Sequence, residues 1–132
     1  IGACMMNEKM EKVLGFGDHG STYGGNPVCC AGAISVIERL DDSFLASVKR
    51  RSGYVMAALA GAPGIEGVSG LGLMLGVKTT APAGAVVKKC IEKGVLFLTA
   101  KHKVRMLPAL NIPMEDLEYA VETLKMVAKE LA

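Results

Sequence analysis

The class of fold follows most directly from residues 71–77, Leu-Gly-Leu-Met-Leu-Gly-Val. The larger apolar side chains alternate along this stretch, which predicts a β-strand with one buried face. Glycine inside a strand is costly, so another group is expected to approach the opposite face closely. That face carries Gly70, Gly72, Met74 and Gly76.

A long helical region is predicted before this strand. Asn26 can cap its N-terminus, and Pro27 suits the first helical position because its missing N–H costs nothing there. The polar residues 41–43 predict a break or kink and a second capping site. Residues 61–64, Gly-Ala-Pro-Gly, should end the helix.

Helix and strand signals alternate after the strand. A helix is expected over residues 81–93, with Gly94 as its stop. Two short strands are expected over 95–98 and 104–107, and a last helix follows Pro113. This order predicts an α+β fold: a short three-stranded, mostly antiparallel sheet with helices packed on one face, preceded by the long kinked helix.

Composition excludes several classes of function. The 15 basic and 13 acidic residues are interspersed and the aromatic share is 5%, so neither a nucleic-acid-binding arm nor a base-stacking surface is expected. No apolar run is long enough to cross a membrane. The hydrophobic share of 51% indicates either a rich core or apolar surface that meets a missing domain or a second subunit.

The four cysteines do not have the spacing of a metal site or of a disulfide framework. Reduced thiols in a cytoplasmic protein are the simplest interpretation. Cys30 and Cys90 lie on apolar faces of predicted helices, and we expect both to be small core residues.

Residues 17–27 form a glycine-rich loop with adjacent hydroxyls at Ser21 and Thr22. Such a loop can direct backbone N–H groups and hydroxyls toward a phosphate. It is not a Walker A loop, because no Gly-Lys-Ser/Thr follows. By spacing alone, a helix-capping loop is the commoner explanation.

Arg105 is flanked by apolar residues of the predicted strand 104–107. A half-buried guanidinium there needs a carboxylate or phosphate partner. The partner is either an acidic side chain of the same fold or a bound ligand, and the residues alone leave both open.

Three segments resemble the class III aminotransferases of fold type I, among which the acetylornithine and ornithine enzymes are the nearest. They are residues 19–27 (HGSTYGGNP), 67–77 and 103–112 (KVRMLPALNI). The resemblance implies that Thr22 contacts the phosphate of pyridoxal 5'-phosphate and that Ser21 lies by the phosphate and the substrate. It also implies that Arg105 pairs with the substrate α-carboxylate. The glycine-rich loop is implied to reach the cofactor of the neighbouring subunit in a homodimer.

Two departures from the family pattern matter. Ser69 stands where the family usually has arginine. No residue matches the lysine that forms the Schiff base with the cofactor, since Lys9, Lys12 and Lys101 do not precede the family's glycine-rich run. The resemblance therefore implies a C-terminal piece that starts just after that lysine, with a truncated start at Ile1 and no catalytic residue of its own.

The resemblance implies a parent enzyme that transfers an amino group from N-acetylornithine, or a related ω-amino acid, to 2-oxoglutarate in arginine biosynthesis. Residues 1–26 are expected to be the tail end of the large cofactor-binding domain, with a buried strand over 1–6, and residues 27–132 the small C-terminal domain. The isolated chain should be inactive, because it lacks the imine-forming amine. Two alternatives stay open: an ornithine or 4-aminobutyrate aminotransferase, and a non-catalytic phosphate-binding or assembly module.

Overall fold

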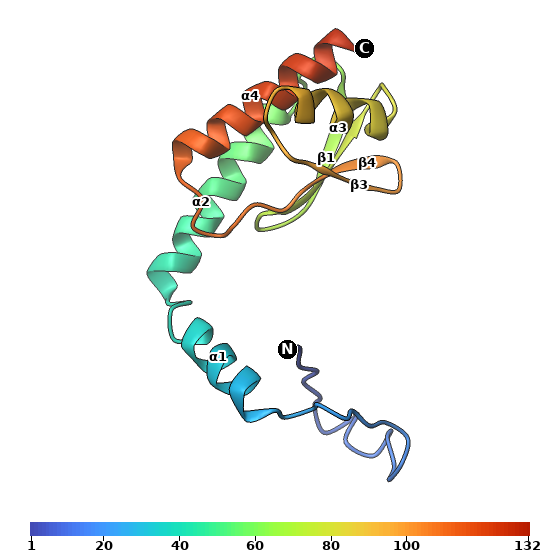
Figure 1. Ribbon diagram of the computed structural model, residues 1–132, viewed down its shortest axis with the longest axis vertical. Coiled ribbons are helices and arrows are strands. Elements are labelled where there is room, and N and C mark those ends of the chain that lie inside the picture. The colour runs from blue at the N-terminus through green and yellow to red at the C-terminus, as the bar shows by residue number, and fades with distance from the viewer. The chain divides into compact units, whose positions relative to one another are not determined.

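The computed structural model describes all 132 residues and divides them into two compact units, Ile1–Asp42 and Ser43–Ala132. Figure 1 shows the order of the elements along the chain. The first unit contains one helix, α1 (Pro27–Ile37). Every strand and the other three helices belong to the second unit, apart from Asp42, which is the first residue of α2.

Helix α1 begins where the sequence predicts. The side-chain oxygen of Asn26 accepts hydrogen bonds from the amides of Val28 at 3.1 Å and Cys29 at 3.2 Å, and Pro27 is the first helical residue. Two of the unpaired N–H groups at the helix start are thereby satisfied. A local signal was sufficient here because the cap and the amides are neighbours in sequence.

The strand predicted over residues 1–6 is wrong. These residues have no regular secondary structure and are exposed. A strand requires hydrogen bonds from a second strand, and the first unit contains none.

The predicted long kinked helix is two separate helices. Helix α1 ends at Ile37, and α2 (Asp42–Leu59) begins after a complete break. The polar residues 41–43 do mark the interruption, and Asp42 lies in the first turn of α2, where the helix dipole favours a negative charge.

The sheet has four strands rather than the predicted three. They are β1 (Ile65–Leu71), β2 (Met74–Thr79), β3 (Leu98–Ala100) and β4 (Lys103–Met106), in the order β1-β2-β4-β3, and every pairing is antiparallel. The predicted strand 71–77 contains a hairpin turn, because Leu71 pairs with Met74. Gly72 has a φ of 56°, as a two-residue hairpin turn with glycine at its first position requires.

The close approach expected at the strand glycines is confirmed at two positions. Gly70 has a φ of 142°, and a Cβ atom there would overlap the carbonyl oxygen of Met74. At Gly76 a Cβ atom would lie 3.0 Å from Cδ of Lys103. The absence of a side chain at Gly76 therefore lets the side chain of Lys103 pass over β2.

The two strands predicted around a polar turn both exist. Strand β4 agrees within one residue, whereas β3 begins at Leu98 instead of residue 95. The turn consists of Lys101 and His102, and Lys101 has a φ of 54°, the only positive φ outside glycine.

Helices α3 (Ala83–Glu92) and α4 (Met114–Glu130) complete the second unit. One core is built from α2, α3, α4 and a single face of the sheet. Its fully buried large side chains include Val55, Leu59, Val77, Val86, Val104, Leu117, Val121, Leu124 and Val127. The predicted α+β class, with helices on one face of the sheet, is confirmed, and the opposite face is left open.

Candidate functional site

Arg105 lies in β4 on the open face of the sheet. Its cross-strand neighbours are Gly76 on β2 and Leu98 on β3. The side chain is exposed, and the guanidinium forms no ion pair or hydrogen bond within the chain. An ion pair inside the fold was one of the two partners considered for Arg105, and that alternative is wrong.

A pocket of about 200 Å³ opens beside Arg105. Arg105 is its only charged lining residue, and the apolar remainder comes from the β3–β4 region, the segment after β4 and α4, including Phe97, Leu107 and Leu117. An apolar wall with one cation at its edge suits a ligand that has an aliphatic body and a carboxylate.

Large apolar side chains share the open face with Arg105. Leu71 is 89% exposed, Met74 is 61% exposed and Leu98 is 57% exposed. An apolar surface around an unpaired guanidinium is typical of a surface that receives a ligand or another part of a protein.

Ser21 and Thr22 lie in the glycine-rich loop of the first unit, and both are exposed. The backbone N–H of Gly24 donates to the carbonyl oxygen of Ser21 at 3.4 Å, so the loop turns there. Neither hydroxyl forms a hydrogen bond within the chain, whereas the first amides of α1 are satisfied by Asn26. The two hydroxyls are therefore free to donate to phosphate oxygens.

The lysines differ from a cofactor-binding lysine in their surroundings. An amine that reacts with an aldehyde at neutral pH is activated by desolvation or by a neighbouring cation. No lysine of this chain is buried, and the two lysines that face each other across the sheet, Lys78 and Lys103, have their ammonium groups bound to Glu66 and Ser69. The residues present thus fit the phosphate and carboxylate groups of a cofactor and substrate, but they do not fit the aldehyde.

The histidines and cysteines form no candidate site. His19 and His102 are exposed in loops, and no group of three or more His, Cys, Asp or Glu side chains could hold a metal ion. Cys90 is fully buried, and this burial raises the pKa of its thiol to about 11. Its predicted place in the core is confirmed, whereas Cys30 is only half-buried.

Sequence reasoning missed Lys103. Its Nζ donates a hydrogen bond to Oγ of Ser69 at 2.7 Å, and its side chain passes over Gly76. The available signal was the alternation in β4: if residues 104 and 106 are buried, residues 103 and 105 share the open face.

The sequence profile of the family described as aminotransferase class-III matches residues 1–128. The chain belongs to this family. Acetylornithine aminotransferase of Haemophilus ducreyi is 45% identical over 133 residues, which cover 99% of this chain and 34% of that protein. The mitochondrial acetylornithine aminotransferase of Saccharomyces cerevisiae is 40% identical over 129 residues, 92% of this chain and 30% of that protein.

A solved class III structure has the same fold. Ornithine aminotransferase of Toxoplasma gondii, which contains pyridoxal phosphate at partial occupancy in its active site, matches with a TM-score of 0.74 and 29% identity. The match covers 90% of this chain and 31% of that chain. The chain thus spans about a third of the length of these relatives. Class III aminotransferases depend on pyridoxal phosphate and use amino-acid and keto-acid substrates.

No helix of this chain has the length and apolar character needed to span a bilayer. The cytoplasmic location stays a prediction, and the yeast relative is mitochondrial. The homodimer likewise stays a prediction.

Proposed function

We propose that this chain is the C-terminal part of an aminotransferase that moves an amino group from N-acetylornithine, or a related ω-amino acid, to 2-oxoglutarate in arginine biosynthesis. The observation that carries the proposal is the unpaired guanidinium of Arg105 beside an apolar pocket, in a chain of this family. The relatives from Haemophilus ducreyi and Saccharomyces cerevisiae are acetylornithine aminotransferases, which favours N-acetylornithine over ornithine or 4-aminobutyrate as the donor.

In this proposal the residues of the chain bind and orient the cofactor and the substrate, while the bound cofactor supplies the electron sink for the chemistry. Arg105 holds the substrate α-carboxylate through two parallel N–H donors, which fix both its position and its plane. Thr22 and Ser21 donate hydrogen bonds to the cofactor phosphate, and Ser21 also lies by the substrate. An exposed cation beside an apolar pocket suits a ligand-binding role better than a purely structural one.

Residues 1–26 belong, in this proposal, to the large cofactor-binding domain, and residues 27–132 form the small domain of a cytoplasmic homodimer. The loop containing Ser21 and Thr22 serves the cofactor of the neighbouring subunit. Exposed apolar side chains in the first unit support the proposal that this region packs against another protein surface. Phe16 is fully exposed, and Tyr23 and Val28 are 82% and 81% exposed.

A chimeric enzyme tests the proposal. The last third of the Haemophilus ducreyi relative would be replaced by this chain, and amino transfer from N-acetylornithine to 2-oxoglutarate would be measured. We expect an active chimera in which Arg105→Gln lowers kcat/KM about 100-fold or more, because two charge-assisted hydrogen bonds are lost. The same charge change at Lys88→Gln, on the exposed side of α3, should have little effect.

A chimera that folds and binds pyridoxal phosphate but transfers no amino group would contradict the proposal. Full activity of the Arg105→Gln chimera would contradict the role of Arg105. The isolated chain, measured alongside, is expected to be inactive.

A further inference from the structure

Three cationic side chains share the open face of the sheet. Lys103 lies two residues before Arg105 on β4, so both side chains leave the strand on the same side. The register places Lys78 of β2 directly opposite Lys103. Like charges at such positions destabilise a sheet unless another charge compensates for them.

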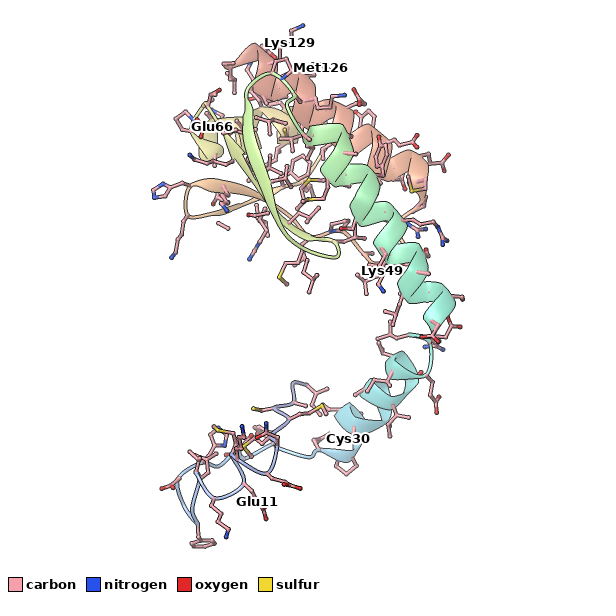
Figure 2. The ribbon with its side chains drawn as sticks, turned by 180° about the vertical axis from the view of Figure 1, so that it is seen from behind. Glu11, Cys30, Lys49, Glu66, Met126 and Lys129 are labelled. Carbon is pink, nitrogen blue, oxygen red and sulfur yellow. The ribbon has the colours of Figure 1, made fainter.

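Only one of the three cations has a carboxylate partner. Nζ of Lys78 lies 2.6 Å from Oε2 of Glu66, which is labelled on β1 in Figure 2. Lys103 contacts a neutral hydroxyl, and the guanidinium of Arg105 has no partner in the chain. Two positive charges of this face are therefore left without a negative charge.

Lys103 is held in place over the sheet. Its Cδ passes 3.0 Å from the position of a Cβ atom at Gly76, which glycine leaves vacant. The Oγ of Ser69 accepts from Nζ at 2.7 Å, and the same hydroxyl donates to the carbonyl oxygen of Gly76 at 3.4 Å. A half-buried lysine side chain whose ammonium is already hydrogen-bonded loses less conformational entropy on binding a ligand than a free lysine does.

We propose that Lys103 is a specificity-determining residue: it adds a second cation beside Arg105, so that the open face binds a dicarboxylate more tightly than a monocarboxylate with the same carbon chain. The inference rests on the proposed function, in which Arg105 takes one carboxylate, and it assigns the recognition of the second negative charge to Lys103. A dianion compensates for both charges, whereas a monoanion leaves one uncompensated.

Two further features fit a dicarboxylate. Leu71, Met74 and Leu98 provide exposed apolar surface on the same face of the sheet, which the carbon chain of a ligand at Arg105 can contact. Ser69 of β1 accepts the hydrogen bond from the ammonium of Lys103. Lys103 therefore brings a cation from β4 across β2 to β1.

Binding of two small acids to the 132-residue chain tests this inference. The dissociation constants for 2-oxoglutarate, a dianion, and 2-oxopentanoate, a monoanion with the same chain length, would be measured by NMR titration at low ionic strength. Lys103→Met should weaken binding of 2-oxoglutarate about three- to tenfold and of 2-oxopentanoate by less than about twofold, as expected for a partly exposed ion pair. Lys88→Met, the same charge change on α3, should leave both constants unchanged, and Arg105→Gln should weaken both.

The amide spectrum of each variant reports whether the sheet is intact. If Lys103→Met weakens both acids equally, or neither, the inference is overturned while the role of Arg105 stands. If Arg105→Gln also leaves both dissociation constants unchanged, the proposed role of Arg105 is contradicted as well. An unaltered chain that does not discriminate between the two acids would also overturn the inference, and the chimera assay tests the proposed function independently.

Discussion

Arg105 and Cys90 lie in opposite environments within the same unit. Arg105 is exposed and charged on the open face of the sheet, whereas Cys90 is fully buried on α3 among the helices. Burial disfavours the charged form of a thiol, so Cys90 stays neutral and acts as a small core side chain. The two positions contrast the open face of the sheet with the packed core on its other side.

Cys90 makes the stability of the second unit depend on pH in the alkaline range. Its pKa is about 11 in the folded chain against an ordinary value of 9.0, so the unfolded chain releases this proton first as the pH rises. Stability should therefore fall between about pH 9 and about pH 11, by on the order of 2 kcal/mol from this group.

Urea unfolding at about pH 8 and about pH 10.5 measures this loss. The unaltered chain should lose more stability between the two pH values than Cys90→Ala does. Equal losses in the two proteins would show that the thiol does not titrate as its burial implies.

The helices and strands show which parts of a fold a local pattern can predict. The start of α1 was predictable because Asn26 caps amides two and three residues away. The β1–β2 hairpin was not, since the alternation of residues 71–77 continues through the turn at Gly72. Alternation shows that side chains face opposite sides, but it does not show where the chain reverses.

The link between α2 and β1 contains two glycines that differ in one respect. Gly61 and Gly64 have φ values of 69° and 79°, so alanine is strained at both. A Cβ atom at Gly61 would meet nothing within 4 Å, whereas at Gly64 it would overlap the carbonyl oxygen of Ala128 in α4.

Gly61→Ala should therefore cost about 1–2 kcal/mol of unfolding free energy, from backbone strain alone. Gly64→Ala should cost at least about 2 kcal/mol more, because the connection can no longer lie against α4. Thermal or urea unfolding of the two variants gives the difference. Similar costs would mean that the link does not pack against α4 as described.

Taken as a whole, the chain combines a well-packed unit with one that buries nothing of its own. No residue of Ile1–Asp42 is buried, although this unit contains Phe16, Tyr23 and the apolar helix α1. The high hydrophobic share thus comes both from a core in Ser43–Ala132 and from exposed apolar side chains. Such a distribution supports a larger protein in which another surface covers the first unit.

The candidate site was only partly predictable from the sequence. Ser21, Thr22 and Arg105 were identified because their segments are contiguous and resemble those of a family. Lys103 was missed because its contact joins residues 34 apart in sequence. That contact depends on the strand order β1-β2-β4 and on the space above Gly76, which no local pattern shows.

The most direct test asks whether the chain holds the reactive lysine of an aminotransferase. The purified chain would be mixed with pyridoxal phosphate, treated with borohydride and analysed by visible absorbance and intact mass. We predict no stoichiometric adduct at any single lysine, because every lysine is at least partly exposed to solvent. A stoichiometric adduct at one lysine would contradict this and place the reactive amine within these 132 residues.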